Sequence, residues 1–191
     1  MARQTPVVAI AASAGGPAAL AEVLAGIGGL QAPVLLIQHI DERFMDGFTQ
    51  WMARASALPV ELARDRERLR PGVVYVGPSG VHSKLIQGRR IALDPDPERL
   101  HRPSADVLFE SVSQWAGPAA VGVLLTGMGE DGARGLLAVR LAGGHTIVQD
   151  RTTSAVYGMP GAAARLDAAT EILPLSAIPD AVVRAVKRAR P

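Results

Sequence analysis

Residues 7–17, which read Val7-Val8-Ala9-Ile10-Ala11-Ala12-Ser13-Ala14-Gly15-Gly16-Pro17, decide the fold. Six apolar residues without polar alternation are typical of a strand that is buried on both faces, as in a parallel sheet. Small residues around Ser13 allow the backbone to turn sharply, and a proline is tolerated in the first turn of a helix. The stretch therefore predicts a strand, a tight turn and a helix, with Ser13 at the carboxyl end of the strand.

The same alternation continues along the chain. Apolar runs predict further strands at residues 33–38, 121–126, 145–149 and 171–175. Helical spacing predicts helices at about 16–24, 44–56, 104–115 (with Ser104 as the N-cap), 131–142 and 178–189, with one more short helix after Gly161. Strands that alternate with helices favour an α/β, doubly wound, mostly parallel sheet with helices on both faces.

Residues 58–94 depart from this alternation. Short strand-like segments at 60–63, 73–76, 84–86 and 91–93 are separated by turns rich in glycine, proline and arginine. This pattern predicts an antiparallel meander or hairpin that extends one edge of the sheet. Because no repeat or linker interrupts the chain, residues 1–191 are expected to form one catalytic-type domain.

Composition narrows the class of protein. The 191 residues are 48% apolar and 20% charged, with a net charge of +2, and they include no cysteine. A disulfide framework, a thiolate zinc site and a cysteine nucleophile are therefore excluded. Only 4% of the residues are aromatic, and the charge is nearly balanced, so no nucleic-acid partner is expected. No apolar run approaches the roughly 18 residues of a membrane span, so we expect a cytoplasmic protein without membrane insertion.

Three residues far apart in the sequence each follow a predicted strand: Ser13, His39 and Asp131. Parallel sheets place their sites at the carboxyl ends of strands, so these side chains are able to meet there. A serine nucleophile needs a histidine base, and the base needs an acid to orient it. Taken alone, each residue also has a structural explanation, such as an N-cap for Ser13, or for Asp131 ahead of helix 131–142.

A rival interpretation concerns the loop from Gly127 to Gly132. Its sequence satisfies the dinucleotide-binding pattern G-x-G-x-x-G, and Asp150 lies about where a ribose-binding acid is expected. Glu130 and Asp131, however, would place two negative charges beside a pyrophosphate. No pair of histidines has the spacing of helical metal ligands, so no metal is expected. Hydrolysis by a serine nucleophile requires no organic cofactor either. A non-enzymatic signalling scaffold is a third alternative.

Seven stretches together resemble the catalytic domain of the chemotaxis protein-glutamate methylesterases, the CheB family. They are Ala12-Ser13-Ala14-Gly15-Gly16-Pro17, Gln38-His39, Tyr75-Val76-Gly77-Pro78 with His82, Arg102-Pro103-Ser104-Ala105-Asp106, Leu125-Thr126-Gly127-Met128-Gly129-Glu130-Asp131-Gly132-Ala133, Gln149-Asp150 and Tyr157-Gly158-Met159-Pro160. They lie in the family's order over about residues 7 to 183.

The resemblance implies a serine hydrolase. Ser13 would be the nucleophile, His39 the base and Asp131 the orienting acid. The reaction implied is hydrolysis of glutamate methyl esters on methyl-accepting chemotaxis receptors, and members of the family also deamidate receptor glutamines. The family's oxyanion donor corresponds to the backbone N–H of Met128, and we add the N–H of Ala14 because it follows the nucleophile.

The chain also departs from the family pattern. Ala14 stands where a threonine usually follows the nucleophile, and Asp41 stands near the place where a proline is common. The family's N-terminal receiver domain is absent from this chain, which is expected to be either a single-domain member or a fragment. These departures bear on substrate preference and rate more than on the type of reaction, and the oligomeric state stays open.

Overall fold

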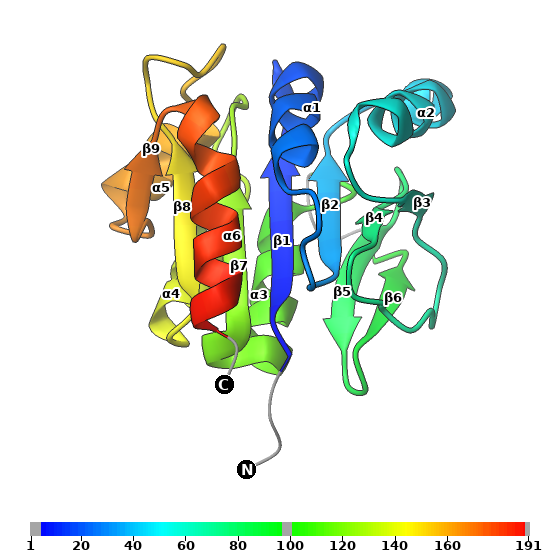
Figure 1. Cartoon of the computed structure of the whole chain (residues 1–191). Helices are drawn as coiled ribbons and strands as arrows, with labels where there is room; N and C mark the ends of the chain where they lie inside the picture. The colour runs from blue at the N-terminus through cyan, green and yellow to red at the C-terminus, as the bar shows by residue number, and fades with distance from the viewer. Residues whose placement is uncertain (1–4, 97–100, 190–191) are drawn as a thin grey trace.

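The computed structural model describes residues 5–96 and 101–189, and its centre is a seven-stranded parallel sheet (Figure 1). The strand order is β3-β4-β2-β1-β7-β8-β9. The strands are β1 (Val7–Ala12), β2 (Val34–Gln38), β3 (Val60–Leu62), β4 (Val74–Val76), β7 (Ala120–Leu124), β8 (His145–Gln149) and β9 (Glu171–Leu173). A separate antiparallel hairpin consists of β5 (His82–Ile86) and β6 (Arg90–Asp94). The predicted domain also includes residues 1–4, 97–100 and 190–191, which lie outside the described residues.

Helices cover both faces of the sheet, as the α/β prediction requires. They are α1 (Gly16–Gly26), α2 (Met45–Ala55), α3 (Ala105–Ala116), α4 (Ala133–Leu141), α5 (Met159–Arg165) and α6 (Ile178–Arg188). Single-turn helices lie at Glu42–Phe44, Gly117–Ala119 and Leu175–Ala177. One buried apolar cluster joins α1, α2 and α6 to the sheet, and a second joins α3, α4, α5 and the hairpin to the opposite face.

The alternation of side chains along each strand creates these two clusters. In β2, Leu36 packs in the first cluster and its neighbour Leu35 in the second. All residues of β1 and β2 are buried, which explains why their sequences show no polar alternation. The predicted doubly wound fold is thereby confirmed.

The prediction for residues 58–94 is correct only for the hairpin. β3 pairs with β4 in parallel, and β4 pairs with β2 in parallel, so both strands belong to the main sheet. The hairpin forms its own two-stranded sheet, packed through Leu85 and Ile91 into the second cluster, and does not extend an edge of the main sheet. Short strands between turns carry no signal of direction, so the sequence could not separate the two cases.

The strand order sets the position of the functional residues. β1 lies between β2 and β7, and the chain reaches β2 first and returns to the other side of β1 only at β7. The order reverses at this point, where open α/β sheets leave a crevice at the carboxyl ends of their strands. Ser13, His39 and Asp131 follow these three neighbouring strands.

Candidate active site

Ser13 and His39 lie side by side because of the register between β1 and β2. Ala12 pairs with Gln38, so the residues that follow them occupy adjacent positions just beyond the sheet. The His39 N–H donates to the Ala12 carbonyl at 3.1 Å, and the Ser13 N–H donates to the Thr126 carbonyl at 3.0 Å. Gly15 adopts a φ of +76°, a left-handed conformation that favours glycine and closes the turn into α1.

Asp131 contacts His39 from the far side of β1. The distance from His39 Nε2 to Asp131 Oδ2 is 2.8 Å, although the residues are 92 positions apart in the sequence. Both side chains are largely buried, with 13% and 8% of their surfaces exposed. The structure therefore brings together the histidine and the acid that the sequence predicted as partners.

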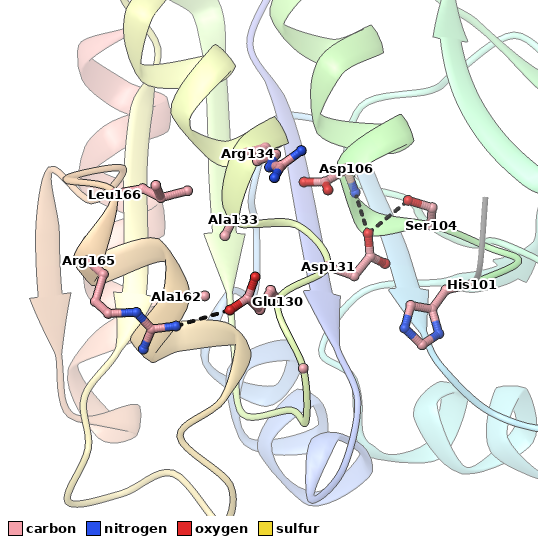
Figure 2. Close-up of a pocket in the computed structure, with 11 residues that line it drawn as sticks. His101, Ser104, Asp106, Glu130, Asp131, Ala133, Arg134, Ala162, Arg165 and Leu166 are labelled. Carbon is pink, nitrogen blue, oxygen red and sulfur yellow. Dashed lines mark hydrogen bonds and ion pairs between the residues drawn. The ribbon is translucent and has the colours of Figure 1, made fainter. Parts of the chain in front are cut away.

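Asp131 does not cap its own helix. Helix α4 begins at Ala133 with Gly132 as its N-cap, so the alternative N-cap role for Asp131 is wrong. The carboxylate instead accepts hydrogen bonds from the N–H groups of Ala105 at 2.7 Å and Asp106 at 3.1 Å, at the start of α3. The Ser104 hydroxyl donates a further hydrogen bond at 2.8 Å (Figure 2).

These contacts set the charge of Asp131. Burial by itself raises the pKa of the carboxyl group, because it disfavours the charged form. The hydrogen bonds from His39, from the N–H groups of Ala105 and Asp106 and from Ser104 outweigh burial, and they lower the pKa from 3.8 to about 2. Asp131 is therefore a carboxylate at neutral pH and is able only to accept hydrogen bonds.

The charge of Asp131 in turn determines the tautomer of His39. Because the carboxylate accepts, Nε2 must carry the proton in their hydrogen bond. In the neutral ring Nδ1 then has the free lone pair and is the nitrogen that can accept a proton. Within the described residues, the Ser13 hydroxyl and His39 make no hydrogen bond, and such contacts commonly tighten only when substrate binds.

Two backbone N–H groups near Ser13, those of Ala14 and Met128, are the predicted oxyanion donors. No described group accepts a hydrogen bond from the N–H of Ala14 or of Met128. The loop of Met128 lies against the serine, because a Cβ built on Gly127 would be only 2.8 Å from Ser13 Cβ. Both predicted donors thus lie in segments adjacent to Ser13.

Two histidines without a predicted role support the site. His101 stacks on His39, with ring centroids 4.7 Å apart and an angle of 15° between the planes. His82, in the hairpin, accepts a hydrogen bond from the Ser104 N–H through Nδ1 at 3.1 Å. Desolvation by burial lowers the pKa of His82, which favours the neutral ring that this contact needs. Their proximity to the site depends on the packing of the hairpin and of α3, which local sequence does not reveal.

A cavity of about 480 Å³ opens beside Asp131, between the starts of α3 and α4 and helix α5 (Figure 2). His101, Ser104 and Asp131 line the wall next to His39. The ion pair between Arg165 and Glu130, 3.3 Å long, lies on the opposite side. The cavity therefore adjoins the Ser13, His39 and Asp131 constellation.

The dinucleotide alternative is not supported. The Asp150 carboxylate accepts hydrogen bonds from Thr152 and Thr153 within its own loop, and Asp131 is held by His39 and the start of α3. Among the described residues, no group of three or more histidine or acidic side chains could hold a metal ion. None of the helices described is long and apolar enough to cross a membrane.

The doubly wound sheet defines an α/β protein, and it places Ser13, His39 and Asp131 after three neighbouring strands, with His39 and Asp131 in contact. The CheB methylesterase family profile matches residues 8–182. The chain belongs to the CheB methylesterase family.

Relatives and a solved structure agree with this family. A protein-glutamate methylesterase/protein-glutamine glutaminase of Pseudomonas savastanoi pv. phaseolicola is 49% identical over 93% of this chain and 53% of its own length. A protein of the same name from Cupriavidus metallidurans is 52% identical over 90% of this chain and 51% of its own. The chain thus spans about half the length of these relatives.

The fold likewise has a solved counterpart. The crystal structure of the CheB methylesterase catalytic domain of Thermotoga maritima superposes with a TM-score of 0.89 at 30% sequence identity. The match covers 94% of this chain and 97% of that one. The chain is thus similar to a catalytic domain over nearly its whole length.

Proposed function

We propose that this chain is a serine hydrolase that removes methyl esters from glutamate residues of chemotaxis receptors. The observation that carries the proposal is the 2.8 Å contact between His39 and Asp131 at the strand end next to Ser13. The names of the relatives, protein-glutamate methylesterase/protein-glutamine glutaminase, supply the class of substrate. The proposed setting is the cytoplasm, where the methylated segments of such receptors lie.

The proposed reaction has two stages. His39 Nδ1 accepts the proton of the Ser13 hydroxyl as the Ser13 oxygen bonds to the γ-carbonyl carbon of the ester. The N–H groups of Met128 and Ala14 donate to the tetrahedral oxyanion. The proton passes from His39 to the methoxy group, and methanol leaves. Water then attacks the acyl-enzyme by the same route, and glutamate and free Ser13 are released.

Asp131 supports both stages without gaining a proton. Because its pKa is lowered to about 2, it stays charged while His39 carries its second proton. The carboxylate stabilises the imidazolium and keeps the ring oriented through Nε2. No metal or organic cofactor enters this scheme.

Deamidation of receptor glutamines is a second candidate activity. It follows from the double name of the relatives, and it uses the same attack on a γ-carbonyl carbon, with ammonia as the leaving group. An amide is intrinsically less reactive than an ester, because delocalisation of its nitrogen lone pair makes the carbonyl carbon less electrophilic.

The Ser13→Ala variant tests the proposal. Removal of the nucleophile should lower kcat for methanol release from methylated receptor by about 10⁶-fold, by analogy with other serine hydrolases. Methanol release and labelling of Ser13 by a fluorophosphonate probe are the measurements. Turnover close to that of the unaltered protein would refute the assignment, and an unaltered protein that neither turns over nor labels would favour the signalling scaffold.

A further inference from the structure

The side chain of Gln38, the last residue of β2, connects the two neighbouring strand ends of the site. It is buried, with 3% of its surface exposed. Its Nε2 group donates to the Ser13 carbonyl at 2.9 Å and to the His39 carbonyl at 3.0 Å. One amide group thus binds the backbone of the proposed nucleophile and that of the proposed base.

These two hydrogen bonds lie where the sheet ends. The ladder between β1 and β2 stops at the pair Ala12 and Gln38. Beyond it, one backbone hydrogen bond remains, from the His39 N–H to the Ala12 carbonyl, and Ser13 then enters the turn to α1 while His39 enters the loop that leads to α2. The Gln38 amide continues the connection by one residue on each strand.

The oxygen of the Gln38 side chain defines a second requirement. Gln38 Oε1 is buried and has no hydrogen-bond partner among the described residues. It rests against Gly16, where an added Cβ would lie only 2.0 Å from it. The lack of a side chain at Gly16 therefore makes room for Gln38 Oε1, and the two hydrogen bonds that Nε2 donates fix the orientation of the amide.

We propose that Gln38 is a positioning residue that holds Ser13 and His39 at the separation needed for proton transfer. The inference rests on the proposed hydrolase function and extends it to a residue that touches neither substrate nor the reacting atoms. Displacement of a reacting group by about 1 Å can lower a rate by about 10²-fold. The loss of the two hydrogen bonds of Gln38 should therefore have a large effect on the rate.

The Gln38→Met variant tests the inference, because methionine has a similar length and no donor. We expect kcat for methanol release from methylated receptor to fall by about 10²-fold with KM nearly unchanged, since the substrate contacts remain. The rate of Ser13 labelling by a fluorophosphonate probe should fall with kcat.

A second variant approaches the same contact from the other side. Gly16→Ala places a methyl group 2.0 Å from Gln38 Oε1, its nearest neighbour, and 2.8 Å from Ala12 Cβ, and it should produce the same split between kcat and KM. If both variants act through the amide, their combined effect on kcat should be clearly smaller than the product of the single effects. Independent, multiplicative effects would contradict the inference.

Thr146→Val is the matched control. Thr146 is fully buried near the start of β8, at the opposite end of the strands from the site. Its hydroxyl donates a hydrogen bond to the Ala168 carbonyl and accepts one from the Thr170 N–H. This variant should lose stability but keep kcat. A comparable fall of kcat in Thr146→Val, or unchanged kcat in folded Gln38→Met or Gly16→Ala, would overturn the role of Gln38.

The labelling readout separates this inference from the proposed substrate. If the unaltered protein releases no methanol from methylated receptor but labels at Ser13, the substrate assignment fails, and slower labelling of Gln38→Met still supports the positioning role. If the unaltered protein does both and the Gln38→Met variant matches it, only the positioning role fails.

Discussion

Asp131 accepts hydrogen bonds from the His39 imidazole on one side and from the first turn of α3 on the other. The positive end of a helix dipole and two backbone N–H groups favour a negative charge at this place. The same carboxylate therefore binds the proposed base and accepts hydrogen bonds from the first N–H groups of α3. Its ionisation links the chemistry of the site to the stability of the fold.

This link gives a prediction for acid stability. The folded-state pKa of Asp131 is about 2 against 3.8 for the free group, so the unfolded chain binds more protons between these values and stability falls as pH falls. The contribution is about 2 kcal/mol, fully present above pH 5 and lost toward pH 2. Asp131→Asn should lack this part of the pH dependence, which urea unfolding at several pH values would measure.

A matched substitution separates Asp131 from the general effect of charge. Glu130→Gln removes the same charge from the neighbouring exposed residue, and its unfolding free energy should follow the pH dependence of the unaltered protein. Identical pH curves for Asp131→Asn and Glu130→Gln would contradict the coupling.

At neutral pH we also expect Asp131→Asn to lower kcat by about 10⁴-fold, because the amide no longer holds the required tautomer of His39.

Ala14 shows how a departure from the family pattern is accommodated. Its side chain is exposed, and its carbonyl accepts a hydrogen bond from the Thr126 hydroxyl at 2.9 Å. The turn is thus held through the backbone of residue 14. The support of this turn comes from Thr126, which lies just after β7.

Among the elements, α3 and α4 position Asp131, which binds the first turn of α3 and lies two residues before α4. The two helices are packed so closely that a Cβ on Gly135 would lie 2.6 Å from the Asp106 carbonyl oxygen and 2.8 Å from Phe109 Cβ. The N–H of Gly135 also donates to the Asp106 carboxylate at 2.7 Å. The separation of these helices therefore sets the distance between Asp131 and the start of α3.

The Gly135→Ala variant should force the helices apart. We expect a loss of about 1–3 kcal/mol in the free energy of unfolding, because the added methyl group overpacks the contact. Gly47→Ala is the control, since Gly47 lies within α2 and a Cβ there meets no atom within 4 Å. That substitution should stabilise the protein by about 0.5–1 kcal/mol through the helix propensity of alanine. Equal effects of the two variants in chemical unfolding would refute the packing argument.

At the scale of the whole molecule, the two apolar clusters share one sheet. Leu35 and Leu36 are neighbours in β2 and pack into opposite clusters, so neither cluster can come apart while the strand stays in place. We infer that the chain unfolds as one cooperative unit, consistent with the expected single domain.

The two tryptophans allow a direct test. Trp51 lies in α2 on one face, and Trp115 lies in α3 on the other. The single-tryptophan variants Trp51→Phe and Trp115→Phe should each show a fluorescence transition that coincides with their own loss of far-ultraviolet circular dichroism, because both layers depend on the shared strands. A fluorescence transition of either variant that precedes its circular dichroism transition would show that the faces unfold separately.

Much of this protein is predictable from local sequence, because buried strands and turns have recognisable residue patterns over a few neighbouring positions. The unbroken apolar runs of β1 and β2 predict strands buried on both faces, and Ser104 predicts the start of α3 through its side-chain cap. Ser13 and His39 follow strands that pair in register, so their proximity follows once the parallel sheet is inferred.

Other features depend on how distant segments pack. Asp131 precedes α4 but binds the start of α3, and His82 and His101 reach the site through the hairpin and the segment before α3. The parallel pairing of β3 and β4 and the contact of Gln38 with two strand ends are likewise tertiary. The sequence alone determined the buried strands and the turn at Ser13, because these follow from local burial and backbone preference, and it supplied the candidate site residues at the strand ends. Only the tertiary structure decided which hydrogen-bond partner each polar group found, because those partners lie as far apart in the sequence as the 92 positions between His39 and Asp131 and the 112 between Ala14 and Thr126.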